Sequence, residues 1–254
     1  MGRGLRLGSI VSLAALAVLA VPSGAGASAV PAQAPVPAHW WQANGNANDT
    51  PGAGVSPDNG RLVGAGFGPG PSGTEQAFTF AGGGQRVIFN KTGGNRGTGG
   101  FTFEFDIKTT VTVQQAVWEK RTACDSNGTP LWGFRTSPTG QLPGSIGFEY
   151  GNPPRESGVI STTSISDGAW HQVAVTRSGG TVKLYIDGNL EATSTTPATA
   201  YLSNNASMRA GVSTCDGVDG TRPFTGELDE LMIFRSALTQ PQIQALARAD
   251  GLAG

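Results

Sequence analysis

Charged residues and histidines are scarce in this 254-residue chain. Charged residues make up 14% of the sequence, and histidine occurs twice, at positions 39 and 171. An average soluble domain has about 25% charged residues. The net charge of −1 gives no sign of the basic surface that binds nucleic acid. No His-Glu-x-x-His motif is present, so a histidine-ligated zinc centre would need both histidines.

The scarcity of charged, helix-forming residues is matched by an abundance of glycine and hydroxyl side chains. The chain has 39 Gly, 25 Thr and 19 Ser, a composition that favours strands and tight turns over helices. Residues 101–107 alternate Phe, Phe, Phe and Ile with polar residues, which predicts a half-buried strand. Residues 170–177 and 181–186 flank a Ser-Gly-Gly turn and predict a hairpin. Asp187-Gly188 then predicts a type I′ turn that sets the register of the next strand.

No hydrophobic run is long enough to span a bilayer. The longest, residues 10–21, has twelve residues, whereas a transmembrane helix needs about 20. Arg3 and Arg6 precede this run, and Ala-x-Ala sites follow it at residues 25–27 and 27–29. This order is typical of a secretory signal peptide. We therefore predict a signal peptide over residues 1–29, a Pro/Ala-rich leader over residues 30–38 and an extracellular protein without a membrane span after cleavage.

Only two cysteines are present, Cys124 and Cys215, and no Cys-x-x-Cys motif. In an oxidising compartment an isolated pair is more often a disulfide than a metal or redox site. We predict that Cys124 and Cys215 are bonded.

One helix is expected, at the C-terminus. Thr239 and Gln242 match a capping box with Pro241 in the first turn. Ile243, Leu246 and Ala247 form an apolar stripe, and Gly251 ends the helix. Many short strands with one terminal helix predict an all-β fold: a two-sheet antiparallel β-sandwich, or jelly roll, over residues 39–254.

A jelly-roll glycosidase would place three carboxylates at alternate positions of one strand. Glu227 and Asp229 fill the first two positions, but Leu231 occupies the third. Glu230 is expected on the opposite face unless the register breaks. The general acid is therefore missing, and we expect no catalytic activity.

Three segments together resemble the laminin-G-like, concanavalin-A-like jelly-roll family. They are the Trp170-His171 strand, the Tyr-Ile-Asp187-Gly188 turn and the Gly-Glu-Leu-Asp-Glu strand of residues 226–230. The resemblance covers essentially the whole expected domain and places Trp170 in the inter-sheet core. It implies a secreted binding module for glycans or proteins, in many members with calcium at the rim of the sandwich.

Two candidate calcium sites follow, because calcium takes 6–8 oxygen ligands. The resemblance carries over Asp49 and Asp229 as a rim pair. Independently, a Cys124–Cys215 bond would join two oxygen-rich loops that contain Asp125, Asn127, Asp216 and Asp219. Both sets could instead be ordinary Asx turns.

For glycan contact we consider Trp132 and Tyr150 with Asn152 and Arg155, because sugars stack on exposed aromatic rings beside amide and charged groups. The alternative, that both aromatic residues belong to the core, is favoured over contact with a glycan. The sequence thus favours a secreted, non-catalytic, carbohydrate-binding module assisted by calcium. The alternatives are a glycan hydrolase or lyase on the same fold, and a protein-binding or structural adhesion module.

The cysteine prediction has a direct test. Thiol titration of the exported protein under denaturing conditions should detect no free thiol. Detection of both thiols would contradict the disulfide.

Overall fold

The computed structural model describes Met1 and residues 34–124, 129–152, 155–197 and 199–252. Residues 2–29 of the predicted signal peptide, residues 30–33 of the leader, Asp125 and Asn127 lie outside the described residues. No helix in the described part of the chain is long and apolar enough to cross a membrane.

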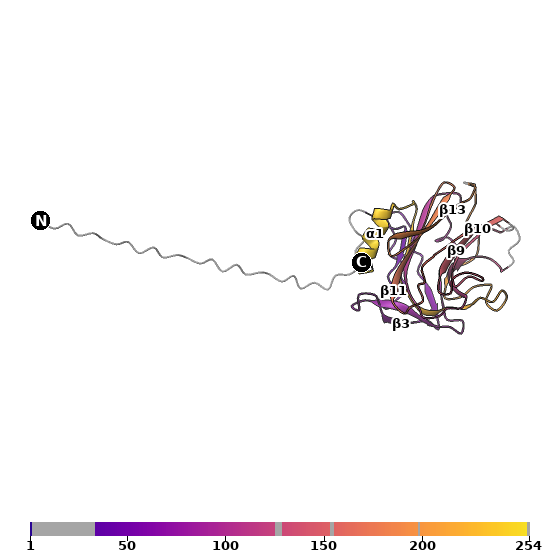
Figure 1. The fold of residues 1–254 in the computed structure, drawn as a ribbon, viewed down its shortest axis with the longest axis horizontal. Helices are drawn as coiled ribbons and strands as arrows, with labels where there is room; N and C mark the ends of the chain where they lie inside the picture. The colour runs from indigo at the N-terminus through magenta and orange to yellow at the C-terminus, as the bar shows by residue number, and fades with distance from the viewer. Residues whose placement is uncertain (2–33, 125–128, 153–154, 198, 253–254) are drawn as a thin grey trace.

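The described residues form two eight-stranded sheets packed face to face, as predicted (Figure 1). We call them sheet 1 and sheet 2. Sheet 1 has the order β13 (Asn189–Thr195), β12 (Thr181–Ile186), β11 (Trp170–Ser178), β6 (Phe101–Lys108), β16 (Thr225–Phe234), β4 (Gln76–Ala81) and β3 (Gly66–Pro69), and β1 (His39–Trp41) also pairs with β16.

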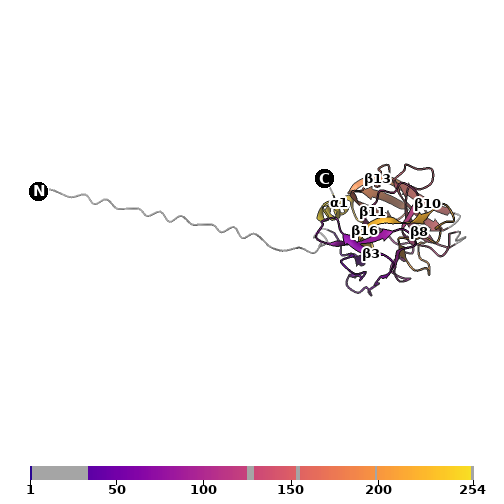
Figure 2. The same ribbon diagram turned by 90° about the horizontal axis from the view of Figure 1, so that it is seen from below.

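Sheet 2 has the order β10 (Arg155–Ile160), β9 (Ile146–Asn152), β8 (Leu131–Thr136), β7 (Gln115–Lys120), β14 (Arg209–Ala210), β5 (Arg86–Ile88) and β2 (Arg61–Val63). Strand β15 (Arg222–Pro223) pairs with β7 in parallel, and the other strand pairs are antiparallel. Figure 2 shows the two layers from below.

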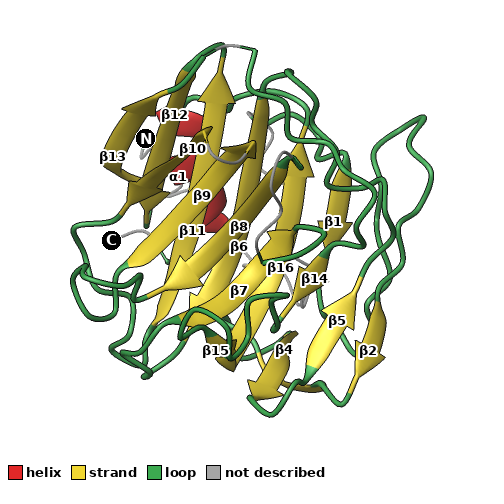
Figure 3. Cartoon of the chain, turned by 90° about the vertical axis from the view of Figure 1, so that its right-hand side faces the viewer, coloured by secondary structure: helices red, strands yellow, loops and turns green. Residues whose placement is uncertain are grey.

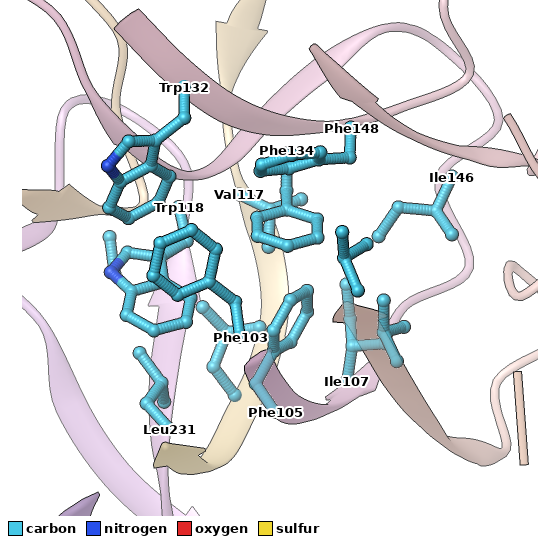
Figure 4. Close-up of a cluster of buried hydrophobic side chains, with 14 of the residues drawn as sticks. Phe103, Phe105, Ile107, Val117, Trp118, Trp132, Phe134, Ile146, Phe148 and Leu231 are labelled. Atoms are coloured by element: carbon cyan, nitrogen blue, oxygen red, sulfur yellow. The ribbon is translucent and has the colours of Figure 1, made fainter. Parts of the chain in front are cut away.

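An aromatic core fills the space between the sheets. Phe103 and Phe105 of β6 point inward and meet Trp118, Trp132 and Phe134 of sheet 2 (Figure 4). All five side chains are at most 1% exposed. Aromatic rings in such edge-to-face and stacked pairs contribute beyond the area that they bury. The alternation of residues 101–107 therefore identified the inward face of β6 correctly.

The outward face of β6 is buried as well, which its alternation did not predict. Thr102, Glu104 and Asp106 are 0% exposed. Helix α1 (Gln240–Ala249) lies on the far side of sheet 1 from sheet 2 (Figure 3). Its apolar residues belong to a cluster with Met232 and Phe234 of β16. Sheet 1 is thus covered on both faces over part of its width.

The terminal helix and the hairpin turn form as predicted. Thr239 is the N-cap residue, and its backbone N–H donates to Oε1 of Gln242 over 2.9 Å. Gly251 follows the helix with φ +75°. Asp187 and Gly188 have φ of +50° and +76°, the left-handed conformation that a type I′ turn requires at both central positions.

Trp170 is not in the core. It is half-buried on the outward face of sheet 1, where it pairs with Lys108. The alternation of β11 explains its position, because Val173 and Val175 face inward and Trp170 has the opposite parity.

The packing of α1 gives a stability prediction. Leu246→Ala should lower the free energy of unfolding by about 2–4 kcal/mol, because Leu246 is 1% exposed and its truncation leaves a cavity. The exposed Arg248→Ala should cost less than about 1 kcal/mol. Denaturant unfolding of both variants measures the difference, and equal small effects would mean that α1 contributes little to stability.

Candidate functional site

Five carboxylates gather on the outer face of sheet 1, and we call them the acidic cluster. Glu104 and Asp106 come from β6, Asp229 and Glu230 from β16, and Asp250 from the C-cap of α1. The four strand residues are 0–1% exposed, and Asp250 is 6% exposed. The cluster is therefore shielded from water by the rest of the fold.

A register shift explains why both acids of β16 reach this cluster. Asp229 pairs with Asp106, and the next pair is Met232 with Glu104, so the ladder shifts between Asp229 and Met232. Glu230 lies in this bulge with φ +49°. Its carboxylate consequently accepts a hydrogen bond from Nε1 of Trp40. The expectation that Glu230 faces away from Asp229 is wrong, because it assumed an unbroken strand.

Most carboxylate oxygens of the acidic cluster lack hydrogen-bond partners in the part of the chain that the structure describes. Neither oxygen of Glu104 or Asp106 accepts a hydrogen bond within the described chain. The Gln172 amide lies beside Glu104 and opposes the rise of its pKa, but the amide nitrogen donates to the Ile243 carbonyl oxygen over 3.2 Å. No basic side chain among the described residues forms an ion pair with the cluster. Buried charges without partners are costly.

Burial raises the pKa values of all five acids, and repulsion from neighbouring carboxylates, including Glu75 outside the cluster for Asp229, Glu230 and Asp250, raises them further. Burial is the larger cause, and it raises the pKa of Asp229 to about 8, of Glu230 to about 9 and of Asp250 to about 7. The same causes raise the pKa of Glu104 and Asp106 well above the ordinary range of carboxyl groups. The cluster therefore needs either bound protons or a cation.

The donor set fits a hard divalent cation. Ligand oxygens of Glu104, Asp106 and Asp250 lie within 4.8 Å of one another. Gly70 closes one side, since a Cβ atom there would lie 2.8 Å from Oδ2 of Asp229. Carboxylate oxygens of this number and spacing match calcium better than zinc, because no histidine or thiolate takes part.

Asp49 does not belong to this set. Its Oδ2 is 2.7 Å from Nδ1 of His39 and accepts the Asp58 N–H, while its Oδ1 accepts the Trp40 N–H over 2.9 Å. These hydrogen bonds fasten the loop after β1 to the strand. The rim pair of Asp49 and Asp229 is therefore not brought together, and the other acids of the cluster replace Asp49.

The second predicted set surrounds the disulfide, which joins Cys124 to Cys215 as predicted. Oδ2 of Asp219 is 2.6 Å from Nη1 of Arg135. Burial would raise the pKa of Asp219, but hydrogen bonds from Thr221 and Arg135 outweigh it and lower the pKa. Oδ2 of Asp216 accepts the Ser213 N–H over 3.0 Å. Both acids thus already have donors, and Asp125 and Asn127 lie outside the described residues.

The predicted aromatic contacts for a glycan are wrong. Trp132 and Tyr150 are 0% exposed, and Nε1 of Trp132 donates to the Gly94 carbonyl oxygen over 2.9 Å. Their parity with Phe134 and Phe148 on the same strands could have placed them in the core. Asn152 and Arg155 pair with each other at the end of the β9–β10 hairpin.

A pocket that the sequence analysis missed opens beside the acidic cluster. It has a volume of about 560 Å³, within the range of small-ligand sites. Nζ of Lys108 and Oε2 of Glu227 are 2.9 Å apart in its wall, and we call it the Lys108–Glu227 pocket. Its polar lining also includes Thr79, Gln85, Thr109, Thr110 and Thr225.

The pairing register of sheet 1 brings the charged residues of this pocket side by side. Thr79, Glu227, Lys108 and Trp170 form one cross-strand row on β4, β16, β6 and β11. Nζ of Lys108 lies 5.8 Å from the centroid of the Trp170 ring. The row lies next to the one that pairs Asp229 with Asp106. The pocket thus combines hydroxyl, amide and charged groups with a neighbouring half-buried indole ring.

Comparison with known proteins identifies the family. The model of the Concanavalin A-like lectin/glucanases superfamily, Laminin_G_3, matches residues 81–244. The chain therefore belongs to this family. A search of the curated proteins gives no match.

Solved structures with the same fold include carbohydrate-binding and toxin domains. Domain 4 of AbnA, a GH43 extracellular arabinanase from Geobacillus stearothermophilus solved with arabinotriose, has a TM-score of 0.64 and 21% identity, with 84% of this chain and 98% of that chain covered.

Two toxin domains are also similar. The binding domain of Paraclostridial Mosquitocidal Protein 1 has a TM-score of 0.64 and 12% identity, over 84% of this chain and 52% of that chain. The botulinum neurotoxin serotype D ligand-binding domain, solved with N-acetylneuraminic acid, has a TM-score of 0.62 and 15% identity, over 84% of this chain and 50% of that chain. The chain thus spans about half the length of these toxin domains.

Proposed function

We propose that this protein is a secreted, non-catalytic carbohydrate-binding module that binds a neutral oligosaccharide in the Lys108–Glu227 pocket. The observation that carries the proposal is the polar pocket beside the Trp170 ring. Sugars present hydroxyl groups to polar side chains and C–H faces to aromatic rings. The pocket lining offers the polar side chains, and the half-buried Trp170 ring beside Lys108 offers the aromatic face. AbnA domain 4, which has the same fold and was solved with arabinotriose, makes arabinotriose the first ligand to test.

The burial of the acidic cluster supports the absence of catalysis. Glycoside hydrolysis needs two carboxyl groups that the substrate can reach. Glu227 is 23% exposed at its side chain, but its nearest companions on β16, Asp229 and Glu230, are 0% and 1% exposed. A glycan in the pocket would meet Glu227 paired with Lys108.

Calcium has a structural role in this proposal. A cation in the acidic cluster would neutralise the repulsion between β6 and β16, the two strands that carry Lys108 and Glu227. It would thereby hold the pocket row in register. The disulfide and the predicted signal peptide support secretion, where millimolar calcium is available.

The pocket can be tested with matched variants. Isothermal titration with arabinotriose and a panel of neutral oligosaccharides should show binding that Trp170→Ala and Lys108→Gln each weaken about tenfold, since Lys108 lines the pocket and the Trp170 ring lies beside it. Lys183→Gln, on the same sheet but outside the pocket, should leave the affinity unchanged. Turnover of any bound glycan, abolished by Glu227→Gln, would instead establish the hydrolase or lyase.

If no glycan binds and a protein partner is captured instead, the module is an adhesion domain. Glycan binding that is unchanged in both Trp170→Ala and Lys108→Gln would place the glycan site outside the Lys108–Glu227 pocket.

Calcium binding predicts a change in thermal stability. At a hundredfold excess over its dissociation constant, calcium should stabilise the fold by about 2.7 kcal/mol, which raises Tm by about 5–10 °C for a domain of this size. Asp106→Asn should lose this response, because it removes the charge of one of the three carboxylates whose oxygens lie close enough to share an ion. Asp216→Asn should keep it.

The reverse pattern, with the response lost only in Asp216→Asn, would place the ion at the disulfide loops. A Tm that neither millimolar calcium nor a chelator changes would exclude the site.

A further inference from the structure

A second polar pocket lies on the outer face of sheet 2 and contains two arginines. It has a volume of about 460 Å³, and its lining includes Arg86, Ile88, Ser207, Arg209, Ser213 and Asp216. We call it the arginine pocket. None of these residues belongs to the acidic cluster or to the Lys108–Glu227 pocket.

The short strands β5 and β14 determine which way these side chains point. Val87 and Ala210 are 0% exposed and face the core, so Arg86, Ile88 and Arg209 face outward. Ile88 pairs with Arg209 on one side and with Arg61 on the other. Ile88 therefore forms a small apolar surface at the base of the pocket, with Arg209 beside it on β14 and Arg61 beside it on β2. Of these two arginines, Arg209 lines the pocket.

The arginines of the pocket have unused donors. Neither Arg86 nor Arg209 forms an ion pair with any residue that the structure describes. Nη1 of Arg86 donates to the Gly84 carbonyl oxygen over 2.9 Å. By contrast, Arg121 and Arg135, on the same face, are paired with Glu119, Glu149 or Asp219. A guanidinium group has five N–H donors, so most of those in the pocket are available to a ligand.

The disulfide loop forms the opposite wall. Oγ of Ser213 is 2.6 Å from Oε2 of Glu119, which fixes the loop to β7. Asp216 is the acid among the lining residues, and its Oδ2 is turned to the Ser213 N–H. The lining of the arginine pocket therefore carries the positive charges of Arg86 and Arg209 and the negative charge of Asp216. The bond between Cys124 and Cys215 holds this wall in place.

We propose that the arginine pocket binds the anionic group, a sulfate or a carboxylate, of an acidic glycan. Guanidinium groups bind planar carboxylates and sulfate oxygens through paired hydrogen bonds, and Ile88 offers an apolar surface to the sugar ring. The glycan class rests on the proposed function, whereas the anionic group follows from the arginines. The two pockets share no lining residue, so substitutions can be chosen that affect one pocket and leave the lining of the other unchanged.

The experiment is isothermal titration of the purified protein with four probes: a heparin-derived sulfated hexasaccharide, tetragalacturonate, inorganic sulfate and arabinotriose. We expect one of the two acidic oligosaccharides to bind more tightly than inorganic sulfate. The double variant Arg86→Gln/Arg209→Gln should weaken that binding about tenfold or more, without changing the affinity for arabinotriose. Arg222→Gln removes an exposed arginine of the same sheet, outside the pocket, and should have little effect.

Arg209→Lys keeps the charge but loses the paired geometry, so it should show a smaller loss than the double variant. It also serves as the test if the double variant does not melt like the wild type.

Three results would overturn the proposal. They are unchanged binding in the arginine variants, an equal loss in Arg222→Gln, and acidic oligosaccharides that bind no more tightly than inorganic sulfate. Loss of acidic-glycan binding in Lys108→Gln alone would move the ligand to the other pocket. Failure of arabinotriose and the neutral panel, with acidic binding intact, would reject the Lys108–Glu227 pocket and leave the arginine pocket standing.

Discussion

The pairing of β6 with β16 at the centre of sheet 1 is the constraint on which the other features depend. Its register places Ile107 beside Leu228 in the core and Asp106 beside Asp229 on the outer face. Like charges directly opposite in a sheet repel. The core therefore favours a register that the outer face opposes. Neutralisation of the acids, by protons or by a cation, removes this conflict.

The helix increases the same conflict while it stabilises the sheet. Its apolar stripe covers Met232 and Phe234 and excludes water from the strands beneath. Its C-cap residue, Asp250, adds a further carboxylate to the acidic cluster. Since burial rather than repulsion is the larger cause of the raised pKa values, the cover provided by the fold is what makes these acids unusual. The two outer faces of the sandwich thus differ: the outer face of sheet 1 buries carboxylates that form no ion pair with a described residue, and the outer face of sheet 2 presents Arg86 and Arg209, which form no such ion pair either.

Local sequence patterns predicted the parts of the fold that depend on neighbouring residues. The capping box of α1, the Asp187-Gly188 turn and the inward face of β6 each follow from a few consecutive side chains. The alternation of side chains along a strand could also have predicted which face two tryptophans occupy. Trp132 has the same parity as Phe134, and Trp170 has the parity opposite to Val173, so both positions could have been predicted correctly from their own strands.

Composition and periodicity determined that the chain is an all-β sandwich with one terminal helix and a disulfide. They could do so because hydrophobic alternation and turn chemistry act over a few residues. Only the tertiary structure decided which polar groups meet. The acidic cluster joins residues 104, 106, 229, 230 and 250, and the arginine pocket joins β5 to β14, contacts that depend on strand order. The bulge at Glu230 reversed the expected direction of its side chain, because a single inserted residue shifts a ladder whose period is two.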